Sequence, residues 1–246
     1  MFTDFQPFEI ERDGVRLAGR RGGEGPPLLL LHGHPQSHVM WHRVAPDLAR
    51  RHTVVMMDLR GYGDSSRPLP DAAHAAHAKR EMALDALAVM AHWGHARFQV
   101  LAHDRGARVA HRLAADHPDA VERLMLLDVA PTLGMYEGTT EAFARAYWHW
   151  FFLIQPAPLP ERLIESDPQG YLRGVMGKRH AGMSAFAPEA LAEYLRCLSI
   201  PGSAASLCED YRASAGIDLA HDRADVAAGL KLAQPLRVLW GEHGAV

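Results

Sequence analysis

Residues 100–108, Val-Leu-Ala-His-Asp-Arg-Gly-Ala-Arg, decide the fold. An apolar strand runs into a turn of the form small-x-Asp-x-Gly and a helix follows at once, which is the layout of a nucleophile elbow with aspartate in place of serine. Small residues at 102 and 106 let the strand and the helix approach closely. We therefore expect Asp104 to project from the tip of a strand–turn–helix unit.

Outside this segment, apolar runs of strand length recur along the chain, with helical stretches between most of them. Continuous apolar runs suit the central strands of a parallel sheet that is covered on both faces. Asp13-Gly14, between two shorter runs in residues 8–18, is typical of a tight hairpin turn at a sheet edge. The pattern predicts an α/β fold whose strands and main helices are residues 28–31, 53–57, 98–101, 124–127 and 236–240, and residues 81–93 and 105–116.

Between Pro131 and about Ala228 the pattern changes to aromatic and helical segments broken by prolines, without a convincing central strand. We expect a helical cap inserted between two strands of the sheet. The predicted organisation is a core of residues 1–132 and 229–246 with a cap of residues 133–228. A length of 246 residues suits one such domain with an insertion better than two independent domains.

The composition is that of an ordinary globular protein, with 48% hydrophobic and 22% charged residues and a formal net charge of -3. This charge gives no global attraction to nucleic acid or to an anionic membrane, and no apolar stretch is long enough to span a bilayer. The start of the chain has no secretory pattern, and neither Cys197 nor Cys208 has a metal-ligand or redox spacing. We expect a soluble cytoplasmic protein without a metal site.

An aspartate at the elbow changes the chemistry that is available. A carboxylate can attack an sp³ carbon in line, expel a leaving group and form an ester, which water must then hydrolyse. The loop His32-Gly33-His34-Pro35 follows an apolar strand and can aim a backbone N–H at the same point. The alternative for Asp104 is a helix N-cap. The strand, the elbow and the upstream loop together favour a nucleophile.

Arg105 and Arg108 are three residues apart at the start of the following helix, so their side chains can share a face beside Asp104. Together with the helix N-terminus they would form a small anion site. In the simpler alternative, both face solvent or pair with Asp104, which keeps that carboxylate ionised. In the sharper interpretation they hold a substrate carboxylate, which would select a short haloacid over a neutral halide.

At these residues the sequence resembles the fluoroacetate (haloacetate) dehalogenases, and the resemblance extends over nearly the whole chain. It implies an α/β-hydrolase core with a helical cap, and typically a homodimer without a cofactor that acts on a small haloacid and water. The segments that carry it are residues 31–36 (LHGHPQ), 58–63 (DLRGYG), 103–106 (HDRG), 127–132 (LDVAPT), 147–152 (YWHWFF) and 208–213 (CEDYRA).

The resemblance implies catalytic roles for residues on two neighbouring strand ends. Asp104 matches the nucleophile, and Asp128, just after the next strand, matches the residue that orients the general base. Arg105 and Arg108 match the clamp for the substrate carboxylate. The alternative for Asp128 is a turn residue at a strand end.

The resemblance also implies a halide pocket and an oxyanion hole. His149, Trp150 and Tyr211 match the halide pocket, and the backbone N–H groups of His34 and Arg105 match the oxyanion donors. Fluoride is a poor leaving group and a strong hydrogen-bond acceptor, so charge developing on it needs several fixed donors, which His, Trp and Tyr supply. The alternative is that residues 147–152 are an aromatic helix face packed on the core.

Three features depart from the family pattern. Ala102 stands where glycine is usual, and His34 replaces an aromatic residue. In the family, a further strand and helix follow the strand that ends in Trp240-Gly241-Glu242, and the loop between them carries the histidine that activates water. This sequence ends at Val246, and His243 has a different place in the pattern. We expect ester formation on Asp104 but very slow deacylation.

Two other functions remain open. An epoxide hydrolase uses the same aspartate elbow but normally has Trp after the Asp and two cap tyrosines. Arg105 favours an anionic substrate instead, and only Tyr211 has a clear place. The second alternative is a carboxylate-binding protein that has lost turnover, which only the missing histidine supports.

Overall fold

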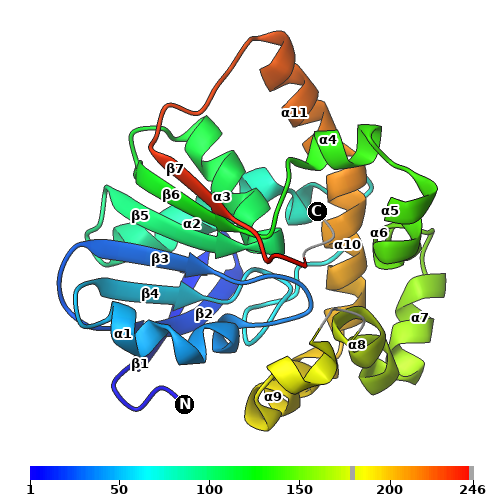
Figure 1. The fold of residues 1–246 in the computed structure, drawn as a ribbon, viewed down its shortest axis with the longest axis horizontal. Helices are drawn as coiled ribbons and strands as arrows, with labels where there is room; N and C mark the ends of the chain where they lie inside the picture. Colours follow the sequence, from blue (N-terminus) through cyan, green and yellow to red (C-terminus); the bar gives the residue numbers. More distant parts are fainter. Residues whose placement is uncertain (178–180, 244–246) are drawn as a thin grey trace.

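The sheet of the computed structural model, which describes residues 1–177 and 181–243, has seven strands in the order β1-β2-β4-β3-β5-β6-β7 among those residues (Figure 1). β1 is antiparallel to β2 and β2 to β4, whereas all the other neighbouring strands are parallel. The predicted α/β class with a mostly parallel sheet is confirmed. The strands are β1 (Gln6–Arg12), β2 (Val15–Gly22), β3 (Pro27–Leu31), β4 (Thr53–Met57), β5 (Phe98–His103), β6 (Val121–Leu127) and β7 (Leu236–Leu239).

The predicted hairpin joins β1 and β2. Asp13 and Gly14 form its turn with φ values of 50° and 76°. Both angles lie in the left-handed region that aspartate and glycine tolerate better than most residues. β1 forms one edge of the sheet, and β2 connects it to β4.

The continuous apolar runs form the buried centre of the sheet. All five residues of β4 are buried, as are the last four residues of β3. Helices α2 (Lys79–His92) and α3 (Asp104–Asp116) connect successive parallel strands and pack against each other. Both helices begin and end within two residues of the predicted ranges. The shorter helices η1 (His38–Arg43) and α1 (Ala45–Leu48) lie between β3 and β4, and η2 (Ala75–His77) precedes α2 in the connection from β4 to β5.

A long helical insertion separates β6 from β7. It contains no strand among residues 132–177 and 181–227, and in Figure 1 it gathers on the side to which the arrowheads of the parallel strands point. Residues 178–180 of the predicted cap and residues 244–246 of the predicted core lie outside the described residues. The inserted helices are α4 (Thr132–Glu137), α5 (Glu141–Ala146), α6 (Trp148–Leu153), α7 (Leu159–Ser166), α8 (Pro168–Met176), η3 (Gly182–Ala185), α9 (Pro188–Leu198), α10 (Ser203–Ala215) and α11 (Ile217–Ala227).

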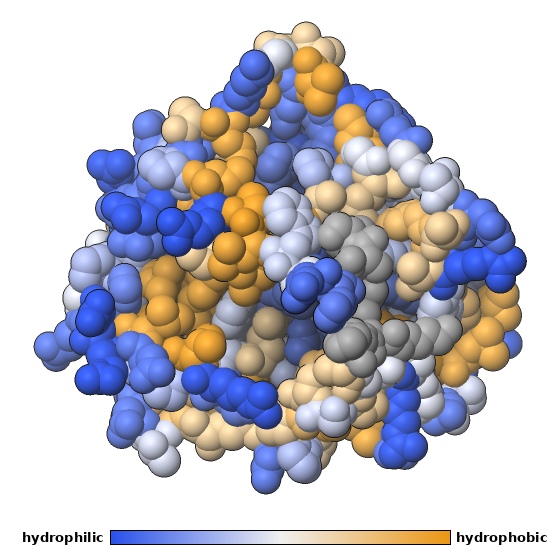
Figure 2. Space-filling model, in the orientation of Figure 1, coloured by the Kyte–Doolittle hydropathy of each residue, from blue (hydrophilic) through white to orange (hydrophobic). Residues whose placement is uncertain are grey.

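The surface between the sheet and the inserted helices is hollowed (Figure 2). Beside this hollow, apolar residues follow β7, where Leu236, Leu239 and Trp240 are about half exposed. In the described part of the chain, none of the helices has the length and apolar character that a membrane span requires.

Candidate active site

Asp104 stands at a sharp turn between β5 and α3. Its φ is 47°, a strained value for a residue with a Cβ. The turn is possible because residue 106 is glycine: a Cβ there would lie 2.5 Å from the His32 carbonyl oxygen and 2.6 Å from that of Leu31. The Gly106 N–H instead donates to His32 O at 2.9 Å. The elbow therefore brings α3 against the end of β3.

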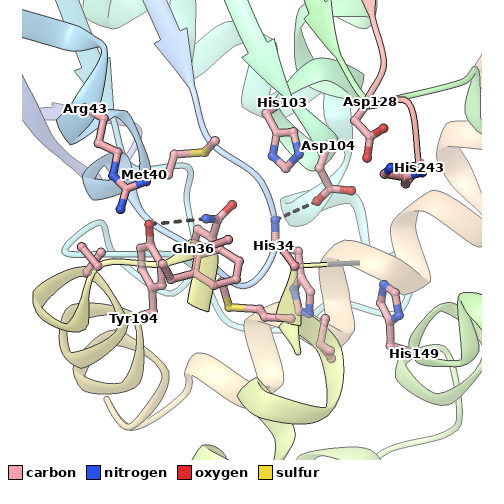
Figure 3. Close-up of a pocket in the computed structure, with 18 of the residues that line it drawn as sticks. His34, Gln36, Met40, Arg43, His103, Asp104, Asp128, His149, Tyr194 and His243 are labelled. Atoms are coloured by element: carbon pink, nitrogen blue, oxygen red, sulfur yellow. Dashed lines mark hydrogen bonds between the residues drawn. The ribbon is translucent and has the colours of Figure 1, made fainter. Parts of the chain in front are cut away.

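The loop after β3 holds one oxygen of the Asp104 carboxylate. The backbone N–H of His34 donates to Asp104 Oδ1 at 2.7 Å (Figure 3). The preceding residue must be small, because a Cβ on Gly33 would lie 2.6 Å from Asp104 Cβ. Since His34 fixes Oδ1, Oδ2 is the oxygen available for attack on a carbon atom.

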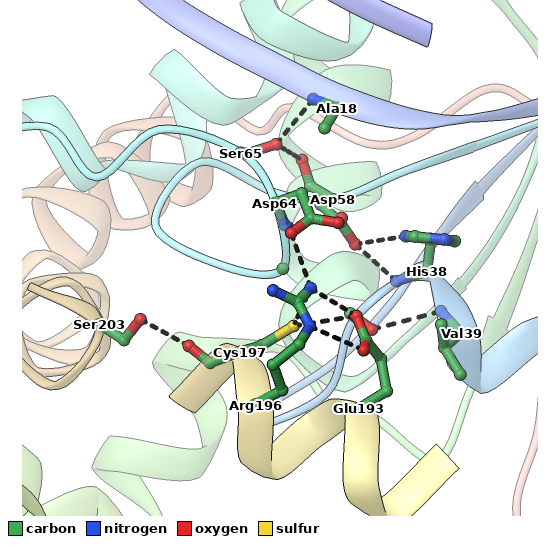
Figure 4. A network of polar contacts seen from close by, with 12 residues as sticks. Ala18, His38, Val39, Asp58, Asp64, Ser65, Glu193, Arg196, Cys197 and Ser203 are labelled. Carbon is green, nitrogen blue, oxygen red and sulfur yellow. Dashed lines mark hydrogen bonds and ion pairs between the residues drawn. The ribbon is translucent and has the colours of Figure 1, made fainter. Parts of the chain in front are cut away.

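A buried carboxylate anchors this loop to the end of β4. Asp58 Oδ1 accepts the His38 backbone N–H at 2.6 Å and contacts His38 Nδ1 at 3.0 Å, while Oδ2 accepts the Asp64 N–H at 3.0 Å (Figure 4). Burial alone would raise the pKa of Asp58, but His38 and these hydrogen bonds outweigh it and lower the pKa to about 2. The loop that carries the His34 N–H is thus tied to an ionised group inside the core.

A cavity of about 600 Å³ opens in front of Asp104. Figure 3 shows Asp104 and Asp128 at one end of it, with Tyr194 and Arg43 at the other. Three of the predicted residues, Arg105, Trp150 and Tyr211, do not line the cavity. Arg105 and Trp150 each follow a lining residue in the chain, and the buried Tyr211 ring lies against the lining residues His34 and His149. The predicted residues that line the cavity are His34, Asp104, Arg108, Asp128 and His149.

Asp104 is ionised despite its enclosed position. Burial by itself would raise the pKa of Asp104, but His103, Arg105 and Arg108 and the His34 N–H together outweigh it and lower the pKa to about 2. A carboxylate that stays charged at neutral pH has the lone pair that nucleophilic attack needs.

Arg108 is held in place by groups that follow β6. Its Nη1 donates to Ala130 O at 3.0 Å and to Thr132 Oγ1 at 2.7 Å, and its Nη2 lies 3.0 Å from Met135 Sδ. Burial and the positive charge of Arg105 lower the pKa of Arg108 to about 10. Arg108 therefore lines the cavity as a positive charge that its own surroundings do not fully neutralise.

Arg105 neither faces solvent nor pairs with Asp104, so the simpler interpretation of its sequence position is wrong. It is fully buried, and its Nε and Nη2 donate to the carboxylate of Asp210 at 2.9 and 2.7 Å. Its guanidinium carbon lies 4.1 Å from the centroid of the Tyr211 ring.

The predicted halide-binding residues form one cluster of rings. The Tyr211 ring centroid lies 5.9 Å from that of His149 and 6.0 Å from that of Trp150, and His34 stacks on His149 with its centroid 5.9 Å away. Burial and the nearby His149 lower the pKa of His34 to about 3, so its ring is neutral at neutral pH. The neutral His34 ring and the donor-bearing rings of His149, Trp150 and Tyr211 thus form one cluster beside Asp104.

Several buried polar atoms around Asp104 lack a hydrogen-bond partner within residues 1–177 and 181–243; besides Tyr136 Oη and the Nδ1 atoms of His34 and His103, they include four donors. Leaving a buried donor unsatisfied costs roughly 1–3 kcal/mol, so such a group calls for an explanation. All four belong to residues that the sequence assigned to anion binding, and an anion beside Asp104 would explain them together. The donors are Arg105 Nη1, Arg108 Nε, Trp150 Nε1 and Tyr211 Oη.

Asp128 follows β6 with a φ of 51° and lines the same cavity as Asp104. Its Oδ1 is buried, and none of residues 1–177 and 181–243 gives it a hydrogen bond. The cavity lining also includes His243, a residue to which the sequence pattern assigned no role, and Figure 3 shows it near Asp128.

Among the residues of the site that the sequence reasoning missed, two bind residues that it had assigned. Tyr171 Oη lies 2.9 Å from His34 Nε2, and Asp210 binds Arg105. No sequence feature marked Tyr171 as a site residue, because the apolar residues of its helix α8 have the spacing of any amphipathic helix. Asp210 had one, since it lies beside Tyr211 in a segment that carries the resemblance. No group of three or more His, Cys, Asp or Glu side chains in the described ranges is arranged to hold a metal ion.

Comparison with known proteins places this geometry in a family. The family described as the alpha/beta hydrolase fold matches residues 26–178. The chain belongs to the α/β hydrolase fold family. The crystal structure of ALR0039 from Nostoc sp PCC 7120 superposes on this α/β hydrolase with a TM-score of 0.96 and 54% identity, over 99% of this chain and 83% of that one.

Two curated relatives of this α/β hydrolase differ in what their names describe. A fluoroacetate dehalogenase from Burkholderia sp is 44% identical over 245 residues, which cover 99% of this chain and 80% of the relative. A soluble epoxide hydrolase from Corynebacterium sp. (strain C12) is 35% identical over 248 residues, with 99% and 83% covered. The chain is thus similar to hydrolases that act at carbon–halogen or epoxide bonds.

Proposed function

We propose that this α/β hydrolase is a haloacid dehalogenase that displaces halide from a short haloacid, such as fluoroacetate, through an ester on Asp104. The observation that carries the proposal is the set of four buried donors without partners around an ionised aspartate. A haloacetate brings two groups that accept such donors, a carboxylate and a departing halide.

In the first step, Asp104 Oδ2 attacks the α-carbon of the haloacid. The new C–O bond forms as the carbon–halogen bond breaks, and the halide leaves with the electron pair. In the second step, water attacks the ester carbonyl carbon and loses a proton to a base that Asp128 orients. The bond between Asp104 Cγ and the ester oxygen then breaks, glycolate leaves with the proton that the base had taken, and Asp104 is restored as a carboxylate.

The His34 N–H serves the second step. It already donates to Asp104 Oδ1 at 2.7 Å, the oxygen that becomes negative in the tetrahedral intermediate. The backbone N–H of Arg105 is the second donor that we propose for it. Removing one such fixed donor typically slows a reaction by about 10² to 10³.

In our proposal the two arginines hold the substrate carboxylate. Arg108 lines the cavity. Its Nε and the Nη1 of Arg105 are buried and have no hydrogen-bond partner among the described residues. The positive charge of Arg105 is close enough to contribute to the lowered pKa of Arg108. A substrate carboxylate would accept hydrogen bonds from both arginines and place the α-carbon against Asp104.

The halide would be received by His149, Trp150 and Tyr211. Trp150 Nε1 and Tyr211 Oη have no partner among the described residues and lie in a ring cluster that excludes solvent. Donors fixed in a dry site stabilise developing charge without reorganising. We also propose that residues 133–228 form a cap that closes this pocket over the core of residues 1–132 and 229–246.

The test is mass spectrometry of the protein after incubation with fluoroacetate, together with a fluoride electrode. We expect a glycolyl ester on the peptide that contains Asp104, release of at least as much fluoride, and neither product with Asp104→Asn. Fluoride release without any ester on Asp104, or an unchanged signal in Asp104→Asn, would contradict the proposal.

An epoxide hydrolase is the second candidate. One observation favours it: besides Tyr211, Tyr147 lines the cavity and Tyr171 lies 2.9 Å from His34, so a second phenol is within reach of the site. Against it stands Arg105 at the position after Asp104. Hydrolysis of styrene oxide without release of halide from haloacetates would favour this candidate.

A further inference from the structure

The guanidinium group of Arg105 is held along one edge only. Its Nε donates to Asp210 Oδ2 at 2.9 Å, and its Nη2 donates to Asp210 Oδ1 at 2.7 Å and to Asp210 O at 2.8 Å. Nη2 also donates to Ser214 Oγ at 2.5 Å. A paired contact of this kind fixes the plane of the guanidinium as well as its position.

The same carboxylate is itself fixed by two further groups. Asp210 Oδ2 accepts the Tyr62 hydroxyl at 2.6 Å, and Oδ1 contacts the ammonium group of Lys79. Lys79 also lies 3.7 Å from Asp218 Oδ2. Asp210 is fully buried, and Arg105, Lys79, Asp210 and Asp218 together carry two positive and two negative charges. The cluster is neutral as a whole.

One nitrogen of Arg105 remains. Nη1 is buried and has no hydrogen-bond partner within residues 1–177 and 181–243. Tyr211, the residue after Asp210, covers the face of the guanidinium at 4.1 Å. Asp210 and Tyr211 therefore hold Arg105 by its edge and by its face, so it can offer an anion only its Nη1 end.

We propose that Asp210 is a positioning residue that turns Arg105 so that Nη1 is presented to the substrate carboxylate. This inference rests on the proposed function. It also specifies the clamp atom by atom: Arg105 contributes Nη1 and Arg108 contributes Nε, while their other guanidinium nitrogens contact the protein. Asp210 acts through Arg105 and touches no reacting atom.

Asp210→Asn tests the proposal. An amide has only one oxygen acceptor, and its NH₂ group opposes the other guanidinium nitrogen, so the orientation of Arg105 is lost while the size of residue 210 is kept. Ester formation on Asp104 is followed by mass spectrometry with chloroacetate and with chloroacetamide, which share a leaving group but differ in charge. We expect the half-saturation concentration of chloroacetate to rise roughly ten- to a hundredfold, as for one charge-assisted hydrogen bond, and that of chloroacetamide to change little.

The chain offers a matched control on the same helix. Arg112 of α3 is also nearly buried and donates to Asp222 Oδ1 at 2.7 Å, without being part of the cavity lining. Asp222→Asn weakens an ion pair of a buried α3 arginine, which keeps Asp116 and Asp225 as partners, and we expect the ratio of the two half-saturation constants to stay at the wild-type value. An equal loss in Asp222→Asn would overturn the proposal, because any weakened contact of α3 would then have the same effect.

A second variant covers the case in which Asp210→Asn does not fold. Lys79→Met combined with Asp210→Asn removes one positive and one negative charge, so the buried cluster stays neutral, and we expect the same loss of preference for chloroacetate. Unchanged constants for both substrates, or equal losses for both, would overturn the role of Asp210. A wild-type chain that forms no ester with chloroacetate would instead refute the proposed function.

Discussion

Replacing Tyr211 by phenylalanine should make the protein more stable and less active. The Tyr211 side chain is fully buried, and its ring centroid lies 4.1 Å from the Arg105 guanidinium carbon, 5.1 Å from the His34 ring and 5.9 Å from the His149 ring, with Trp150 at 6.0 Å. Phenylalanine keeps these contacts. The substitution therefore removes one oxygen atom and leaves the packing as it is.

The change in stability concerns the free protein, whereas the change in rate concerns the transition state, so the two effects differ in size. In the free protein, Tyr211 Oη has no partner within residues 1–177 and 181–243, and a buried unsatisfied group costs about 1–3 kcal/mol. Taking about 1 kcal/mol, the gain in the free energy of unfolding raises the Tm by about 2–4 °C for a chain of this size. In the transition state the lost oxygen is a donor to the leaving fluoride, so ester formation should slow by about 10², the lower end for one fixed donor.

Differential scanning calorimetry gives the Tm, and rapid-quench mass spectrometry gives the rate of ester formation with fluoroacetate and chloroacetate. The loss should be smaller for chloroacetate, because chloride is the weaker hydrogen-bond acceptor. Tyr136→Phe is the control: its hydroxyl is also buried without a partner in the described ranges, and its ring lies 5.1 Å from that of Trp150. We expect a similar gain in Tm there without a loss of rate. A lower Tm in Tyr211→Phe, or an undiminished rate with fluoroacetate, would refute the reasoning.

Three further predictions concern the elbow and the second step. Because the pKa of Asp104 is lowered to about 2, ester formation should keep its rate from about pH 7 to about pH 4. The contribution of this carboxylate to stability is present above its ordinary pKa and should be lost as the pH falls through about 2. A decline of the rate centred near about pH 5 would contradict this prediction. Gly106→Ala places a Cβ 2.5 Å from a backbone oxygen and should cost about 1–3 kcal/mol of unfolding free energy by overpacking, measured by denaturant titration, whereas Gly134→Ala on α4, where a Cβ meets nothing within 4 Å, should not destabilise. Asp128→Asn should leave ester formation unchanged and slow hydrolysis of the ester by about 10² to 10⁴, the contribution of a general base, because Asp128 lines the cavity beside Asp104 and orients the base in our proposal; an unchanged steady turnover of fluoroacetate in this variant would contradict that role.

Much of the fold followed from local signals. The apolar runs became β3 to β7 and the Asp13-Gly14 turn became the first hairpin, because strand burial and turn geometry depend on neighbouring residues. The end of β5 was set in the same way. A small residue, an aspartate and a glycine in sequence are enough for a turn in which a helix can start against the sheet.

The candidate site was less predictable. The sequence placed Arg105 and Arg108 on one face of a helix, which is correct for their backbone positions, but it assigned both to solvent, to Asp104 or to a substrate. The structure pairs Arg105 with Asp210, a residue 105 positions away. Helical spacing says which residues are near one another on a helix and nothing about what packs against that helix.

From sequence alone came the order of strands and helices along the chain, the elbow that lifts Asp104, and the residue types able to bind an anion, since each of these depends on contacts within a few residues. The tertiary structure decided which atoms of those residues remain available. The inserted helices bring Asp210 and Tyr211 onto Arg105, and Ala130, Thr132 and Met135 after β6 bind Nη1 and Nη2 of Arg108. Hydrogen-bond capacity used by a distant partner is no longer available to a ligand, and only folding brings distant partners together.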